Sequence, residues 1–130
     1  MSILNKSILI TGSSDGIGKS LAIAFSKLGA NIILLGRNST KLDEVYDLLD
    51  HSHASQKHLI IDADLALLSN EAAQEILIAI SQEFEGLNGI IHNAAILGTM
   101  SSLEDYDLSS WDEVMKVNLR APFILSLIHI

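Results

Sequence analysis

A glycine-containing turn between an apolar run and a helical pattern constrains this chain more than any other feature. The turn follows Ile8-Leu9-Ile10 and has the sequence Thr11-Gly12-Ser13-Ser14-Asp15-Gly16-Ile17-Gly18. Gly12 suits a tight turn after a strand, Gly16 lets the backbone approach a phosphate, and Gly18 lets a helix pack closely on a sheet. Free N–H groups in the first helical turn would face the phosphates. The turn therefore predicts a dinucleotide site.

Composition narrows the classes of protein and partner. The chain has 130 residues, 48% of them hydrophobic, which suffices for one domain with its own core. A net charge of −8 argues against nucleic acid or an anionic membrane as the main partner. There is no cysteine, and no two histidines have metal-site spacing on one element, so no metal site is expected. Nothing resembles a signal peptide or a membrane span, so a cytoplasmic location is expected.

Apolar periodicity predicts alternating strands and helices. Short, continuous apolar runs are typical of strands buried on both faces of a parallel sheet. Strands are predicted at 7–11, 31–36, 59–61 and 89–92. Helices are predicted at 17–29, at about 41–49 behind a Ser39 cap, and from a Ser69 cap through Ile80. After a loop over about 94–107, Ser109 or Ser110 could cap a last helix. This order predicts an α/β fold of the Rossmann type, with a doubly wound parallel sheet.

Five motifs in order resemble the short-chain dehydrogenase/reductase family. The first is the glycine turn, Thr-Gly-x-x-x-Gly-Ile-Gly. The others, each on the corresponding element, are Leu35-Gly36-Arg37-Asn38, Asp64-Leu65, His92-Asn93-Ala94-Ala95 and Lys116-Val117-Asn118-Leu119. On this resemblance residues 1–130 form an NAD(P)-binding Rossmann domain that is truncated after the fourth strand and its following helix. That portion corresponds to the N-terminal half of the family's fold.

The resemblance also implies which residues hold the cofactor. Gly36 stands where NAD-preferring relatives carry an acid, and the Arg37 guanidinium suits a 2′-phosphate, so NADP is expected rather than NAD. Asp15 points the other way, because many NADP-preferring relatives have a basic residue there. A solvated surface role is the alternative for Arg37. The expected cofactor residues are Gly12, Ser14, Asp15, Gly16, Ile17, Gly18, Arg37, Asp64, Leu65, Asn93 and Ala94.

Two of these motifs leave alternatives open or depart from the family's pattern. Asp64 resembles the adenine-contacting acid of the family, and Asp62 is the alternative, because a one-residue slip exchanges the faces of a strand. Asn93 is expected to tie neighbouring strands together. His92 replaces an asparagine and is expected to be structural, and Ala95 replaces a glycine and narrows the space beside the cofactor.

Asn118 is the candidate catalytic-site residue. Pro122 lacks the N–H that would bond the carbonyl four residues earlier, which belongs to Asn118. That carbonyl is then free to bind a water, and in the resembled family the corresponding asparagine supports a water in the proton relay. A simple kink at the proline is the alternative.

The catalytic groups of the family are not matched in this chain. The family uses a Ser and a Tyr-x-x-x-Lys, whereas Tyr46 is followed four residues later by Asp50, and Tyr106 by Ser110. We expect a portion of an NADP-dependent oxidoreductase that is inactive alone, from a parent that transfers hydride between NADPH and a carbonyl or alcohol. The alternatives are a non-catalytic dinucleotide-binding or interaction module and an enzyme completed by a second polypeptide. The last helix is apolar nearly all round, which favours a homo-oligomer through it.

Overall fold

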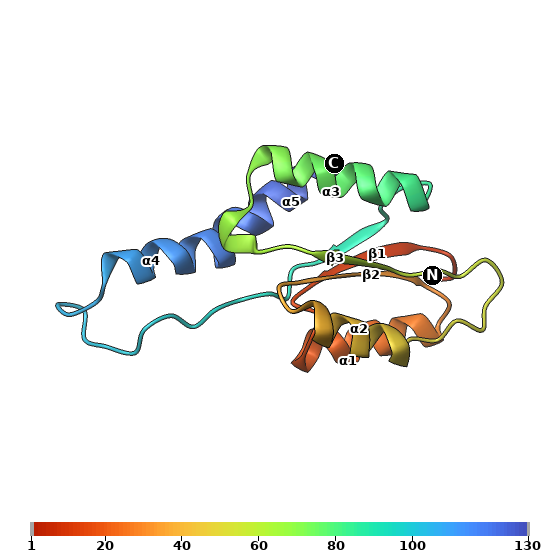
Figure 1. Ribbon diagram of the computed structural model, residues 1–130, viewed down its shortest axis with the longest axis horizontal. Helices are drawn as coiled ribbons and strands as arrows, with labels where there is room; N and C mark the ends of the chain where they lie inside the picture. The colour runs from red at the N-terminus through yellow and green to blue at the C-terminus, as the bar shows by residue number, and fades with distance from the viewer. Residues whose placement is uncertain (1, 130) are drawn as a thin grey trace.

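Four parallel strands form the centre of the structure, a computed structural model that describes residues 2–129. The strands are β1 (Ser7–Thr11), β2 (Asn31–Gly36), β3 (Leu59–Asp62) and β4 (Gly89–Ile91), in the sheet order β3-β2-β1-β4. Figure 1 shows this sheet between two layers of helices. The predicted doubly wound parallel sheet is confirmed.

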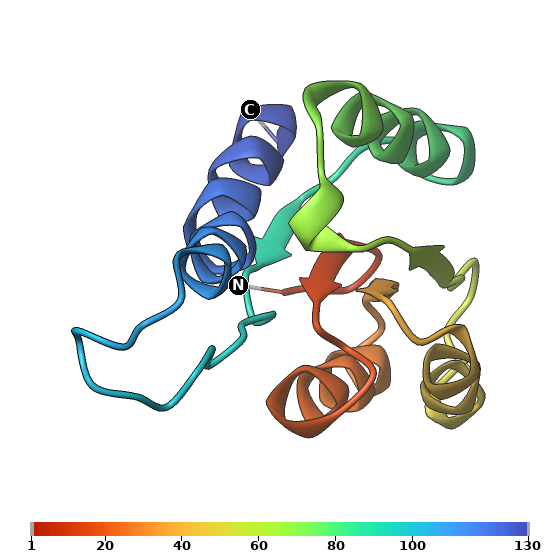
Figure 2. The same ribbon diagram turned by 60° about the vertical axis from the view of Figure 1, so that its left-hand side comes forward.

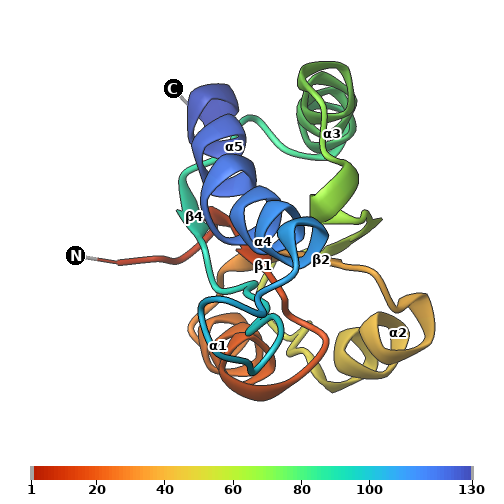
Figure 3. The same cartoon turned by 90° about the vertical axis from the view of Figure 1, so that its left-hand side faces the viewer.

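The helices cover both faces of the sheet. Figures 2 and 3 show two of them on one face and the others on the opposite face. The first layer consists of α1 (Gly16–Lys27) and α2 (Ser39–Leu48). The second layer contains a short 3₁₀ turn η1 (Leu65–Leu67), α3 (Asn70–Glu83), a π-helical segment η2 (Lys116–Arg120) and α5 (Ala121–His129). Helix α4 (Leu108–Met115) precedes η2 and has no buried residue. None of the helices within residues 2–129 is long and apolar enough to cross a membrane.

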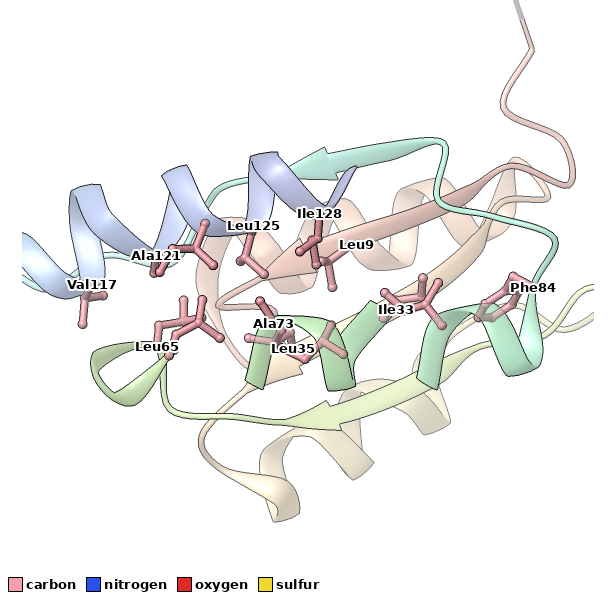
Figure 4. Packing of buried hydrophobic residues seen from close by; sticks show 14 residues of the cluster. Leu9, Ile33, Leu35, Leu65, Ala73, Phe84, Val117, Ala121, Leu125 and Ile128 are labelled. Carbon is pink, nitrogen blue, oxygen red and sulfur yellow. The ribbon is translucent and has the colours of Figure 1, made fainter. Parts of the chain in front are cut away.

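Alternation along β1 and β2 divides the apolar core into two. Leu9, Ile33 and Leu35 point to the α3–α5 side, where they pack against residues such as Leu125, as Figure 4 shows. The intervening residues of the same strands, among them Ile8, Ile10, Ile32 and Leu34, pack against α1 and α2. Every residue of these two strands is buried, which explains their continuous apolar runs.

The strand register brings four loops to one edge of the sheet. Thr11 pairs with Leu35, Ile10 with Ile91, and Gly36 with Asp62. All four strands are parallel, so the segments that follow their carboxyl ends lie together. Figure 1 shows the long connection after β4 and helix α4 reaching beyond this same edge.

Ser69 caps α3 as predicted, whereas two other helix caps differ from the prediction. Asn38 rather than Ser39 caps α2, because its Oδ1 accepts the Lys41 amide N–H at 3.1 Å. Asp107 rather than Ser109 or Ser110 caps α4, and its Oδ2 accepts the Ser110 amide N–H at 3.2 Å. In both cases an earlier Asn or Asp offers the same cap hydrogen bond as the serine. Each helix therefore begins before the predicted position.

The last helical stretch also differs from the single helix that was predicted. It consists of α4, η2 and α5, and its buried residues all lie in η2 and α5. Leu125 of α5 is fully buried, whereas Leu119, Phe123 and Leu127 are more than half exposed. The strand before it, β4, ends at Ile91, so His92 lies outside the sheet ladder.

Candidate dinucleotide-binding site

A cleft of about 400 Å³ lies at the carboxyl edge of the sheet. In open α/β sheets this edge is where ligands bind. The cleft is lined by the glycine turn, the end of β2, the segment after β3, the loop after β4, Lys41 of α2 and Val117 of η2. Of the predicted cofactor residues, those lining it are Gly12, Ser14, Asp15, Arg37, Asp64, Leu65, Asn93 and Ala94. Gly16, Ile17 and Gly18 form the adjoining start of α1.

A set of four hydrogen bonds joins the glycine turn to the loop after β4. The Thr11 hydroxyl accepts the amide N–H groups of Asn93 at 3.1 Å and Ala94 at 3.0 Å. In return, the Asn93 side-chain amide donates to the carbonyls of Thr11 at 3.2 Å and Gly12 at 3.1 Å. Asn93 thus ties β4 to β1, as predicted. Thr11 is only 2% exposed and these bonds are part-buried, so they are partly shielded from water and fix the shape of the cleft floor.

Two glycines of the turn meet different requirements. A Cβ on Gly18 would lie 2.5 Å from the Gly12 carbonyl oxygen and 2.6 Å from the Asn93 side-chain nitrogen, so only glycine allows this close approach. Gly16 has a φ of +53°, and a Cβ on it would meet nothing within 4 Å. The backbone at Gly16 therefore borders open space at the start of α1.

The start of α1 offers hydrogen-bond donors to an anion. The first N–H groups of a helix have no acceptor within the helix. The Asp15 side chain accepts one of them, from Gly16, at 2.7 Å. The amides of Ile17 and Gly18 follow in the same turn, beside the open space at Gly16. Backbone donors, the positive end of the helix dipole and free volume together fit a pyrophosphate.

The cleft also contains two cations and two acids. Arg37 and Lys41 lie on its β2–α2 side, and Lys41 Nζ is 3.8 Å from Asp15 Oδ2. Asp64 lies on the β3 side, where its Oδ1 accepts the Ala66 amide N–H at 2.9 Å. Asp62, the alternative to Asp64, pairs with Gly36 in the sheet and does not line this cleft. The structure therefore brings Asp64 rather than Asp62 to the cleft.

Asn118 supports the cleft from behind. Its Oδ1 accepts the Ile96 amide N–H, and its side-chain N–H donates to the Ile96 carbonyl, both at 2.9 Å. Ile96 lines the cleft, and so does Val117, the residue before Asn118. Asn118 belongs to the π-helical segment η2, in which the Ala121 N–H donates to the Lys116 carbonyl. Such π segments are frequent at functional sites.

His92 makes a structural contact outside the cleft. Its Nε2 is 2.9 Å from the Ser126 hydroxyl, which connects the end of β4 to α5. Burial lowers the pKa of His92 below its ordinary value, and the nearby His129 lowers it further. A neutral imidazole bonded to a hydroxyl fits the structural role that was predicted for this residue.

Sequence reasoning missed three contributors to the site. Lys41 lies in the first turn of α2, and its position four residues after Arg37 was the available signal. Ser13 is fully buried, and its hydroxyl accepts the Leu35 amide N–H at 3.0 Å, which fixes the turn against β2. Ile96 had no signal, because its place depends on the side chain of the distant Asn118.

Comparison with known proteins supports one family. The profile of the short chain dehydrogenase family matches residues 6–129. The uncharacterized oxidoreductase YciK of Escherichia coli K12 is 36% identical over 119 residues, which are 92% of this chain and 47% of that protein. The structure of a short chain dehydrogenase from Pseudomonas syringae matches with a TM-score of 0.90 at 34% identity. The match covers 98% of this chain and 51% of that protein's chain.

A relative with a bound dinucleotide has the same fold. The structure of a short chain dehydrogenase from Shigella flexneri, complexed with NADP, has a TM-score of 0.89 at 32% identity. It covers 99% of this chain, which spans 54% of that structure. The chain thus spans about half the length of each relative named here. The family match over 6–129 and the agreement in fold place this chain in the short-chain dehydrogenase/reductase family, as the N-terminal half of its fold.

Proposed function

We propose that this chain is the cofactor-binding portion of an NADP-dependent oxidoreductase and has no turnover of its own. The parent reaction is hydride transfer between NADPH and a carbonyl or alcohol. When bound, the nicotinamide supplies the hydride. The chain's own contribution is to bind and orient the dinucleotide, because the Ser and Tyr-x-x-x-Lys of the family are not matched in it.

The observation that carries the proposal is the combination of open space beside Gly16 at the start of α1 with two cations, Arg37 and Lys41, that line the cleft. The amides of Ile17 and Gly18 would hold the pyrophosphate at the start of α1. Arg37 and Lys41 would bind the 2′-phosphate beside β2, where Gly36 provides no carboxylate to repel it. The bound NADP of the Shigella flexneri relative supports the same cofactor class.

The remaining cleft residues would hold the adenosine. Asp64 and the Leu65 backbone lie on the β3 side of the cleft, where they would contact the adenine. The backbone of Asn93 and Ala94 lies opposite, on the side that would meet the ribose. Through its two side-chain bonds to Ile96, Asn118 would position the loop that would contact the rest of the cofactor. The backbone carbonyl of Asn118 would hold a relay water.

A binding titration tests the cofactor preference. NADPH and NADH are titrated against the wild-type chain and the Arg37→Ala variant, with bound-nucleotide fluorescence as the readout. We expect tighter binding of NADPH, and a loss of about 1–3 kcal/mol for NADPH alone in the variant, since one charge-assisted contact is removed. Equal affinity for the two nucleotides, unchanged in Arg37→Ala, would refute the NADP preference.

A turnover assay tests the proposed inactivity. The chain is incubated with NADPH and a panel of aldehydes and ketones, with Gly16→Trp as the control, because a bulky side chain there would fill the space beside the first turn of α1. We expect NADPH oxidation at the same background rate for both proteins. Oxidation well above the Gly16→Trp rate would contradict the proposal.

Self-association through the last helix is proposed as well. Met115, Leu119 and Phe123 line an apolar groove together with Asp112, Lys116 and Arg120, and Leu119 and Phe123 are exposed. Exposed apolar surface of this kind marks an interaction site. Sedimentation should show a dimer or larger species that Phe123→Glu dissociates and that Leu103→Glu, on the loop after β4, leaves intact. A monomeric wild-type chain at every concentration would exclude this interface.

A further inference from the structure

One ion pair bridges the mouth of the cleft. Asp15 caps α1 on one side, and Lys41 lies in the first turn of α2 on the other, with 3.8 Å between Lys41 Nζ and Asp15 Oδ2. The other carboxylate oxygen of Asp15 accepts the Gly16 N–H. Of the ion pairs formed within residues 2–129, this is the one whose two members both line the cleft.

Asp15 engages Lys41, which is one of the two cations expected to bind a 2′-phosphate. Arg37 forms no ion pair with any of residues 2–129, so its guanidinium is available to an incoming ligand. The Lys41 ammonium is already shared with Asp15. A phosphate that recruits Lys41 must replace the Asp15 carboxylate as the partner of that ammonium group.

The exposure of the two side chains sets the size of this competition. Their exposed fractions are 52% for Lys41 and 80% for Asp15. Ion pairs in such contact with water contribute at most about 1 kcal/mol, which corresponds to about a fivefold change in affinity. The ion pair is thus strong enough to keep Lys41 beside Asp15, and weak enough for an incoming phosphate to displace Asp15.

We propose that Asp15 is a specificity-determining residue that limits the preference for 2′-phosphorylated nucleotides by competing for Lys41. This inference rests on the proposed function, since it assumes an adenosine nucleotide in this cleft. Asp15 pairs with Lys41, and an incoming 2′-phosphate replaces Asp15 as the partner of Lys41. Removing the negative charge, while keeping the helix cap, should raise affinity for nucleotides that carry the 2′-phosphate.

Calorimetric titration with adenosine 2′,5′-bisphosphate and with 5′-AMP isolates the 2′-phosphate. The substitution is Asp15→Asn, because asparagine caps a helix as well as aspartate does and can keep the bond to the Gly16 N–H. Asp43→Asn makes the same charge change on α2 away from the cleft lining. Lys41→Gln, alone and with Asp15→Asn, completes a double-mutant cycle.

The expected result is a selective gain. Asp15→Asn should bind the 2′,5′-bisphosphate about threefold to fivefold more tightly and 5′-AMP less than twofold more tightly, while Asp43→Asn matches the wild type. In the Lys41→Gln background Asp15→Asn should change the ratio of the two affinities very little. The gain should shrink at high salt, because the interaction is between exposed charges.

Two results would overturn the inference. One is an equal gain for both nucleotides in Asp15→Asn, and the other is a selective gain that persists in the Lys41→Gln background. A wild-type chain that binds the two nucleotides equally would contradict the NADP preference alone, and the inference would then stand only if Asp15→Asn created a preference. Failure of the wild-type chain to bind either nucleotide would refute the proposed function and the inference together.

Discussion

The region around β1 and β2 and the region around α4 and α5 differ in how far they bury their side chains. In the first, every strand residue is buried, and the turn polar groups at Thr11 and Ser13 are bonded to backbone. In the second, α4 has no buried residue, and Phe123 is 63% exposed. The first region holds its shape with its own contacts, whereas the second presents apolar surface. The difference separates the residues that shape the candidate ligand site from those that we propose form an interface.

The largest expected effect compares two leucines of α5. Leu125 is fully buried against the sheet, and Leu127 is 52% exposed. Leu125→Ala should lower the free energy of unfolding by about 2–5 kcal/mol, because it removes core contacts and leaves a cavity. Leu127→Ala should change it by less than about 0.5 kcal/mol. Urea denaturation followed by circular dichroism measures both, and equal losses would mean that the two faces of α5 do not differ in burial.

The next effect concerns the glycine turn itself. Gly18→Ala would place a Cβ against the Gly12 carbonyl and the Asn93 side-chain amide. These two groups are hydrogen-bonded to each other, so making room for the Cβ would break that bond. We expect a loss of about 1–3 kcal/mol in unfolding free energy and at least about a tenfold loss in NADPH affinity. Gly86→Ala is the matched control, because its Cβ would meet nothing within 4 Å. Gly18→Ala with wild-type NADPH affinity would show that the turn is not the phosphate site.

The fold was largely predictable and the side-chain contacts of the site were not. Ile32 to Leu35 predict a buried strand because each residue of a central parallel strand faces a helix layer. The turn glycines predict the cleft because their spacing within one short segment is itself the signal. By contrast, the Asn118 bonds to Ile96 and the Lys41 contact with Asp15 join residues far apart in sequence. No local pattern encodes such pairs, since they depend on how the elements pack.

A smaller effect should follow from loosening the support behind the cleft. Asn118→Leu removes both hydrogen bonds to Ile96 and leaves the loop after β4 without that anchor. Because Asn118 is exposed, we expect a loss of only about 1 kcal/mol in unfolding free energy, measured in urea. Hydrogen exchange at the Ile96 amide should accelerate at the same time. Unchanged exchange there would mean that Asn118 does not hold the loop.

The smallest expected effect is a pH dependence at the opposite edge of the sheet. His58 Nδ1 accepts the Ile32 amide N–H at 3.0 Å, and its Nε2–H donates to the Asp50 carbonyl at 2.8 Å, so the ring must be neutral. Burial lowers the pKa of His58 below its ordinary value, and the adjacent His51 lowers it further, whereas Asp50 partly opposes the shift. The Tyr46 ring also packs against it.

The sign of this dependence follows from the lowered pKa. The unfolded chain takes up a proton on His58 at higher pH than the folded chain does, so the stability contributed by the neutral ring is complete above about pH 6.5 and falls as pH decreases below it. Urea midpoints at pH 7.5 and 5.5 measure the loss. His58→Asn, which can keep an acceptor for the Ile32 N–H, should reduce the difference between the two pH values. An undiminished difference would place the titrating group elsewhere.

The central claim is that the carboxyl edge of the sheet holds an NADP-type dinucleotide, and NMR titration of the amide resonances with NADPH tests it most directly. We expect the amide signals of Ile17, Gly18, Arg37 and Asn93 to shift with a single saturating affinity. The Lys57 signal, at the opposite edge of the sheet, should stay in place. Shifts confined to the opposite edge, or no shifts at millimolar NADPH, would contradict the claim.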